Sequence, residues 1–210
     1  MTELTARTLR EFTSDLASDT PAPGGGSAAA AAGALGAALL RMVVGLTVGK
    51  EKYRDAWEEL APVGETAAEV EKRLLELVDE DTRAFDAVVA ARRLPKESPQ
   101  EKEARSQAIA SATVLAATVP MQTAFFAERA LRAARAALER GNPNTASDAW
   151  AAGLLLSAAV RAALANVRIN LPGVGDAELA RGFREDAAEL ERKSAESLAQ
   201  LGEAALAKGL

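Results

Sequence analysis

A glycine-rich turn followed by a charge-free, alanine-rich run most constrains how this chain can fold. The turn reads Pro-Ala-Pro-Gly-Gly-Gly-Ser at residues 21–27, and residues 28–40 after it carry no charge. Ala and Leu favour helix, and a helix that is apolar on every side is a buried one. We therefore predict a small-residue helix from Gly25 to about Thr47 in the middle of a helical bundle.

Proline and glycine divide the rest of the chain into further helices. Ser98-Pro99-Gln100-Glu101 is a strong start signal, because Ser98 caps the helix, Pro99 suits its first position and Glu101 closes a capping box. Pro62 and Pro120 lie inside two of the predicted helices, and we expect each helix to kink or divide at its proline. The other helices are expected at about residues 2–17, 51 to just before 95, 98–141, 145–169 and 176–208.

No alternating β-branched run appears, so we expect no sheet. The prediction is an all-α fold, a multi-helical bundle of about six long helices in one domain spanning 1–210. The run at 149–160 also carries no charge. Two buried Ala/Gly-rich central helices need covering by many others, which favours a homodimer or higher homo-oligomer.

Composition excludes several kinds of chemistry. The chain contains no His and no Cys, so acid–base steps must come from Asp, Glu, Lys, Tyr or water. We expect no metal site. The net charge of −5 is spread along the chain, which argues against nucleic acid as a partner. The apolar run at 28–40 is too short for a membrane span and residues 1–17 are polar, so we expect a cytoplasmic protein without a membrane partner.

The glycine turn itself has two interpretations. The first N–H groups of a helix lack intrahelical partners and carry the positive end of the helix dipole. Bare amides at Gly24, Gly25 and Gly26, followed by Ser27, therefore suit an anion or a polar ligand edge. The alternative is a tight loop and a close contact between helices. A P-loop is excluded, because no strand precedes the turn and no Lys-Ser/Thr pair follows it.

One carboxylate stands where packing would not place it. Leu60, Val63, Ala67, Val70, Leu74 and Leu77 follow alternating steps of three and four, and the next position in this apolar seam is Asp81. A carboxylate there costs free energy unless it is paired or hydrogen-bonded. Asp81 is either a ligand-pocket carboxylate with a perturbed pKa, a partner of a buried Arg, or a sign that the seam turns to solvent.

Other polar residues leave similar alternatives. Lys50 and Tyr53 share a helix face and either hold an anionic group or are a surface lysine and a packing tyrosine. Asp148 and Asn166 share a face of their predicted helix but lie about 27 Å apart along it. Either one of the two is structural, or the ligand is long, or they serve different sites across an interface.

The polar motifs together resemble the cyclodeaminase/cyclohydrolase family, which includes formiminotetrahydrofolate cyclodeaminases, the C-terminal half of formiminotransferase-cyclodeaminase, and methenyltetrahydrofolate cyclohydrolases. The similarity covers nearly the whole chain, in the family's order. It is carried by segments 21–27, 46–53 (Leu-Thr-Val-Gly-Lys-Glu-Lys-Tyr), 79–85 (Asp-Glu-Asp-Thr-Arg-Ala-Phe), 94–96 (Leu-Pro-Lys), 141–144 (Gly-Asn-Pro-Asn), 147–148 (Ser-Asp) and 166–171 (Asn-Val-Arg-Ile-Asn-Leu).

The resemblance implies an all-helical homo-oligomer that acts on a tetrahydrofolate derivative, polyglutamylated or not, without a further cofactor. It implies catalytic roles for Asp81, Lys50 and Asp148. The substrate-binding residues that it implies are Pro23, Gly24, Gly25, Gly26, Ser27, Tyr53, Lys96, Asn142, Asn144, Ser147, Asn166 and Asn170. Lys50, Lys96 or the amides of 24–26 would receive the anionic glutamate tail, and Asp81 or Asp148 the pterin edge.

Two reactions fit the resemblance. The expected one closes 5-formiminotetrahydrofolate to 5,10-methenyltetrahydrofolate with release of ammonia, which would place the chain in histidine degradation beside a separate formiminotransferase. The alternative is hydrolysis of 5,10-methenyltetrahydrofolate to 10-formyltetrahydrofolate. A third interpretation, from another class, is a non-catalytic helical interaction module whose glycine turn only packs helices.

Overall fold

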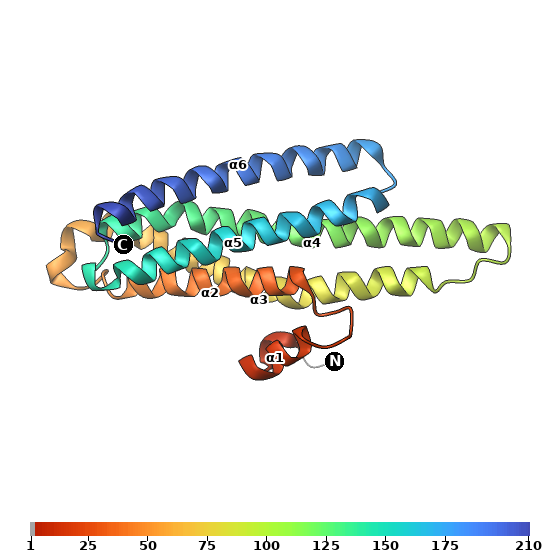
Figure 1. Ribbon diagram of the computed structural model, residues 1–210, viewed down its shortest axis with the longest axis horizontal. Helices are drawn as coiled ribbons and strands as arrows, with labels where there is room; N and C mark the ends of the chain where they lie inside the picture. Colours follow the sequence, from red (N-terminus) through yellow and green to blue (C-terminus); the bar gives the residue numbers. More distant parts are fainter. Residues whose placement is uncertain (1–2) are drawn as a thin grey trace.

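The computed structural model describes residues 3–210, and within that range it contains helices and no strand, as predicted. Five of its α-helices are long and one is short (Figure 1). Their bounds are α1 Leu9–Leu16, α2 Gly25–Gly45, α3 Trp57–Arg92, α4 Pro99–Arg140, α5 Ala146–Asn170 and α6 Ala177–Ala207.

Helices α2, α3, α4 and α5 form an elongated bundle. Helix α2 packs against α3 and α5, and α4 packs against the same two helices from the other side. Helix α6 covers α4 and α5 (Figure 1). The predicted seam of α3 is the core of this bundle, since Leu60, Leu74 and Leu77 are all fully buried.

Small residues let α2 approach α5 closely. A Cβ added to Gly36 would lie 2.9 Å from the backbone oxygen of Ala152, a separation too short for a side chain. The glycine is therefore required by the closeness of the two backbones. Within the single chain, Leu35 on α2 is 58% exposed and Leu154 on α5 is 45% exposed. The covering of these two helices by a second copy stays a prediction.

The predicted capping signal at the start of α4 is confirmed, and a further side-chain cap begins α6. Ser98 and Glu101 form the capping box of α4, and the Asp176 side chain caps α6. Pro62 and Pro120 lie inside α3 and α4, which both continue past them. The segment at Glu51–Ala56 is a 3-10 helix that precedes α3, so the long third helix begins later than predicted.

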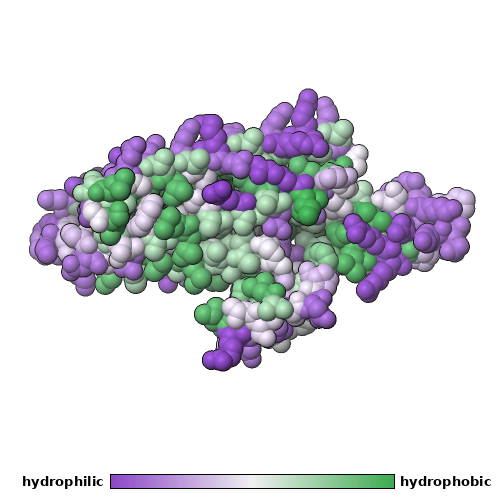
Figure 2. Space-filling model, viewed as in Figure 1, coloured by the Kyte–Doolittle hydropathy of each residue, from purple (hydrophilic) through white to green (hydrophobic). Residues whose placement is uncertain are grey.

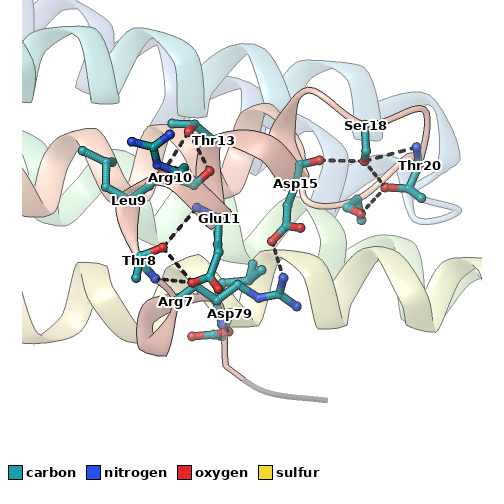
Figure 3. Close-up of polar contacts among 12 residues, drawn as sticks. Arg7, Thr8, Leu9, Arg10, Glu11, Thr13, Asp15, Ser18, Thr20 and Asp79 are labelled. Carbon is teal, nitrogen blue, oxygen red and sulfur yellow. Dashed lines mark hydrogen bonds and ion pairs between the residues drawn. The ribbon is translucent and has the colours of Figure 1, made fainter.

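The predicted first helix is divided in two. Leu4–Ala6 form a 3-10 turn and α1 follows it; Met1 and Thr2 lie outside the described residues. Asp79 of α3 holds the turn, accepting hydrogen bonds from the Leu4 amide at 2.6 Å and the Thr5 hydroxyl at 3.0 Å. A new helix then starts at Thr8, which forms a capping box with Glu11 (Figure 3).

Helix α1 stands outside the bundle, beside α2 and α3 (Figure 1). None of its residues is buried. An ion pair of 2.6 Å joins Arg7, just before α1, to Asp15 near the end of the helix (Figure 3). Between α1 and α2 lies an apolar groove of about 460 Å³, to which Leu9, Phe12 and Leu35 contribute.

Three helical segments are long and apolar enough to cross a membrane by length and composition alone. They lie in Gly25–Gly45, Pro99–Arg140 and Pro143–Gly173, and half of the apolar window is buried in the first and third, one third in the second. The length of the charge-free run at 28–40 therefore does not by itself exclude a membrane span. Packing of α2 against α3 and α5 supplies another reason for its apolar composition.

Candidate functional site

The glycine turn opens α2 directly against a carboxylate of α3. Gly24 is the N-cap residue of α2, and Gly25 and Gly26 begin its first turn. A Cβ added to Gly26 would overlap the Asp81 carboxyl group. Only glycine at this position lets the carboxylate of α3 lie against the start of α2, so the turn and the seam residue form one site.

Asp81 is half-buried and hydrogen-bonded to this turn. The Ser27 hydroxyl, itself fully buried, lies 3.0 Å from Asp81 Oδ2 and 2.9 Å from the Val78 carbonyl oxygen, both of which can accept its proton. Burial raises the pKa of the Asp81 carboxyl above its ordinary value, and hydrogen bonding from Ser27 lowers it by a smaller amount. Asp81 is thus neither a partner of a buried Arg nor a fully solvated charge. It is a desolvated carboxylate at a cavity wall.

Two asparagines at the end of α5 complete the polar end of the site. The Asn170 side-chain amide donates to the carbonyl of Ala116 at 3.0 Å and to that of Asn166 at 2.9 Å. Asn166 donates to the Ala162 carbonyl at 2.9 Å, and its amide nitrogen would lie 3.3 Å from a Cβ on Gly25. These bonds use the amide N–H groups, so the side-chain oxygens of both residues are left as acceptors for a ligand.

These elements enclose a cavity of about 450 Å³. Its walls come from the turn before α2, one face of α3, the end of α5 and one residue of α4. The lining residues are Pro21, Ala22, Gly24, Gly25, Gly26, Asp81, Phe85, Val88, Val89, Arg92, Ala116, Asn166, Ile169 and Asn170.

The other predicted site residues lie at the opposite end of the bundle. The Tyr53 hydroxyl donates to Asn142 Oδ1 at 2.8 Å, and the Asn144 amide donates to the same oxygen at 3.0 Å. Ser147 and Asp148 follow in the first turn of α5, and Lys50 is exposed next to Tyr53. None of these residues lines the cavity around Asp81. A single chain therefore does not bring Lys50 or Asp148 to Asp81, and their implied catalytic roles stay predictions.

Two further predicted binding residues also lie outside the cavity. Lys96 is exposed in the loop between α3 and α4. Pro23 lines a neighbouring cavity of about 320 Å³, together with Thr82 and Asp86. The site residues that the sequence and the structure share are thus the three glycines, Ser27 through its bond to Asp81, Asp81 itself, Asn166 and Asn170.

Four cavity residues that follow Asp81 on α3 were not among the predicted site residues. Phe85, Val88, Val89 and Arg92 come 4, 7, 8 and 11 positions after it, and this is the spacing of one helix face. The apolar seam continues from Asp81 to Val88, but nothing in the sequence distinguishes Phe85, Val89 and Arg92 from ordinary residues near a helix end. Within residues 3–210 no cluster of three acidic side chains is placed to hold a metal ion.

Comparisons with known proteins point to one family. The family profile described as formiminotransferase-cyclodeaminase matches residues 8–189. A methenyltetrahydrofolate cyclohydrolase from Methylorubrum extorquens is 40% identical over 179 residues, covering 85% of this chain and 84% of that protein. A formimidoyltransferase-cyclodeaminase from Rattus norvegicus is 36% identical over 171 residues, covering 80% of this chain but 31% of that protein.

A solved structure extends the similarity to three dimensions. The crystal structure of a formiminotetrahydrofolate cyclodeaminase from Thermotoga maritima superposes with a TM-score of 0.88 at 27% sequence identity, covering 99% of this chain and all of that one. The chain spans about a third of the length of the Rattus norvegicus protein that it matches.

Proposed function

The chain belongs to the formiminotransferase-cyclodeaminase family, and on that premise we propose that it hydrolyses 5,10-methenyltetrahydrofolate to 10-formyltetrahydrofolate. The observation that carries this choice is the 40% identity to a cyclohydrolase over most of both chains. It reverses the preference for the deaminase reaction in the sequence analysis. The family's relatives are enzymes, which argues against a non-catalytic interaction module.

The reaction requires proton transfers at the oxygen and nitrogen atoms around one carbon. Water adds to the carbon that bridges N5 and N10, and a proton leaves the attacking water. The bond from the tetrahedral carbon to N5 then breaks and N5 takes up a proton. The hydroxyl group of the adduct releases its remaining proton to solvent, which leaves a formyl C=O on N10. A single carboxylate at the bridging carbon can accept the first proton and return it to N5.

Asp81 suits this role in the proposed site. Its raised pKa lies nearer to neutrality than that of a solvated aspartate, and a catalytic pKa near the working pH is the most effective. The Ser27 hydroxyl is hydrogen-bonded to one carboxylate oxygen. This bond fixes the orientation of the carboxyl group and therefore of its second oxygen. The Asn166 and Asn170 side chains supply further polar contacts at the same end of the cavity.

The second candidate is the cyclodeaminase reaction, which the close structural match to a formiminotetrahydrofolate cyclodeaminase favours. Here N10 attacks the formimino carbon and loses its proton, and the amino group leaves with a proton as ammonia. The same carboxylate would move the proton from N10 to the leaving nitrogen. Both reactions pass through a tetrahedral carbon between N5 and N10, so the same site serves either.

Supplying each substrate separately to the purified chain tests the proposal. We expect 5,10-methenyltetrahydrofolate to lose its absorbance faster than it does spontaneously, with no ammonia formed. Growth of that absorbance from 5-formiminotetrahydrofolate together with ammonia would instead support the deaminase. Neither change would contradict both candidates.

We further propose that the chain works as a homodimer, paired through the uncovered face of α2. Apolar side chains exposed on α2 include Leu35 and Met42, at 58% and 39%. Figure 2 shows pale and dark green residues across the middle of this face and purple ones at its margins. A contiguous apolar surface bounded by polar residues is typical of a protein interface.

Antiparallel pairing of two α2 helices would also explain the divided site. Leu35 is the middle residue of α2, whose bounds are Gly25 and Gly45. A two-fold axis there would set the glycine turn of one copy beside the Lys50 end of the other. The Lys50 and Asp148 of a second copy would then join Asp81 in one site.

Leu35→Asp is expected to convert the dimer to a monomer, because the substitution places two charges at the centre of an apolar interface. Sedimentation velocity measures the change directly. Leu206→Asp is the control, since Leu206 is 74% exposed on α6, away from α2, and should leave the dimer intact. A wild-type monomer, or a dimer that survives Leu35→Asp, would disprove this interface.

A further inference from the structure

The side chains that α3 contributes to the cavity differ in charge and polarity from one end of the cavity to the other. Asp81 lies at one end against the glycine turn, Phe85, Val88 and Val89 follow, and Arg92 lies at the other end. These residues share one helix face, and the rise of an α-helix places the first and last about 16 Å apart along the axis. The order along the cavity is therefore carboxylate, apolar surface, cation.

The Asp81 end is unsuited to an anion. Its carboxylate already occupies the space in front of the first turn of α2, against Gly26, and this is where the helix dipole would otherwise attract a negative group. A ligand carboxylate placed there would face a like charge. Groups with N–H donors would instead find the Asp81 carboxylate and the Asn166 side chain as acceptors.

The middle of the cavity offers apolar contact. Phe85 is 36% exposed and Ile169, from the end of α5, is 77% exposed, although both are large apolar side chains that line the same cavity. Val88 and Val89 lie half-buried between the two ends. A flat aromatic ring would cover these side chains and remove apolar surface from water.

The Arg92 end offers a free cation. Within residues 3–210 the Arg92 guanidinium has no hydrogen bond or ion pair, whereas many other arginines of the chain are paired with glutamates. The Arg105 guanidinium binds the Arg92 backbone carbonyl at 3.1 and 3.2 Å, which adds a second positive charge at this end. A planar guanidinium is well suited to bind a carboxylate through two hydrogen bonds.

We propose that Arg92 binds the α-carboxylate of the substrate's glutamate tail, with the N5 side of the pterin ring at Asp81 and the aminobenzoyl ring over Phe85. This orientation rests on the proposed folate function and deepens it. It assigns a specificity role to a residue that the sequence analysis did not select. It also replaces the glycine amides, Lys50 and Lys96 as the tail-binding groups within one chain.

The test compares two stable ligands that differ only in the tail. Isothermal titration calorimetry measures binding of 5-formyltetrahydrofolate and of 5-formyltetrahydropteroate, which lacks the glutamate, to wild type, Arg92→Gln and Arg93→Gln. Arg93 is the neighbouring exposed arginine and does not line the cavity, so its variant is the matched control. Thermal melts establish that all three proteins are folded.

Wild type and Arg93→Gln are expected to bind the folate about tenfold more tightly than the pteroate, and Arg92→Gln to lose this preference. A preference that survives in Arg92→Gln, or none in wild type, overturns the role of Arg92. The turnover assays above separate this outcome from failure of the proposed function. If the chain turns over substrate and Arg92→Gln still prefers the folate to the pteroate, only the proposed orientation is contradicted. If the chain neither turns over substrate nor binds either ligand, both the proposed function and the orientation are contradicted.

Discussion

Replacing Asp81 by Asn is expected to lower turnover of 5,10-methenyltetrahydrofolate by about 10²–10⁴-fold, the contribution typical of a positioned general base. The amide keeps the size of the carboxyl group and can still accept a hydrogen bond from Ser27, but it cannot take a proton from water. The free energy of unfolding at neutral pH should not fall. Because burial opposes the charge of Asp81 in the folded state, its removal should leave the protein equally or more stable.

Asp86→Asn is the matched control for this variant. Asp86 lies five residues further along α3, is exposed, and does not line the cavity. We expect its turnover to match that of wild type. Equal turnover in Asp81→Asn and wild type would eliminate Asp81 as the proton carrier, and equal losses in both variants would point to a general effect of charge on α3.

The pH dependence of the two proteins has a defined sign. Asp81 acts as a base only when ionised, so kcat/KM of wild type should fall as the pH is lowered through a pKa above 3.8, the ordinary value. The residual activity of Asp81→Asn should lack this acid limb. A wild-type profile without an acid limb, or a variant that keeps the same limb, would contradict the assignment.

Stability should change with pH in the opposite direction to activity. The folded protein binds the Asp81 proton more tightly than the unfolded chain does, so the ionised group destabilises the fold above its folded-state pKa. This destabilisation disappears as the pH falls from that pKa toward 3.8. The difference in unfolding free energy between Asp81→Asn and wild type should therefore be greatest near neutral pH and shrink in acid, as urea titrations at several pH values would show.

Gly26→Ala is expected to cause the second large effect, a loss of about 10²-fold in turnover. The new methyl group would overlap the Asp81 carboxyl group, so the carboxylate must move, and a displacement of about 1 Å in a catalytic group is enough for such a loss. The overpacking should also lower the free energy of unfolding by about 1–3 kcal/mol. Steady-state kinetics and urea denaturation measure the two effects.

Gly25→Ala separates this explanation from a general need for glycine in the turn. Its Cβ would lie 3.3 Å from the Asn166 amide nitrogen, at the end of a side chain that can shift by a few tenths of an ångström. Alanine also favours helix over glycine by about 1 kcal/mol. We therefore expect a much smaller loss than for Gly26→Ala. Equal losses in the two variants would show that the turn matters as a whole and not through its contact with Asp81.

Much of the fold was predictable because local signals agree with one another along this chain. The Ser98–Glu101 capping box and the Asp176 cap begin helices where predicted. The three-and-four spacing of Leu60, Leu74 and Leu77 identified the buried face of α3. The division of the first helix was missed because it depends on Asp79, a residue 75 positions away from Leu4.

The candidate site was predicted only in part. Asp81 stood out because a charge interrupts an apolar seam, and the glycines because three together are costly in a helix start. Arg92 and Phe85 carry no such signal, since an arginine at a helix end and a phenylalanine near a core are ordinary residues. Absence of a cofactor, cytoplasmic location and a role in histidine degradation stay predictions.

The sequence by itself determined the helices, their buried faces and the family, because capping, periodicity and ordered motifs are all local properties of the chain. The tertiary structure alone decided which polar residues share a site. It placed the glycine turn, Asp81 and the end of α5 around one cavity, and it left Lys50 and Asp148 at the other end of the bundle. The physical reason is that a helix carries residues apart by about 1.5 Å each, while only packing between helices brings distant segments together.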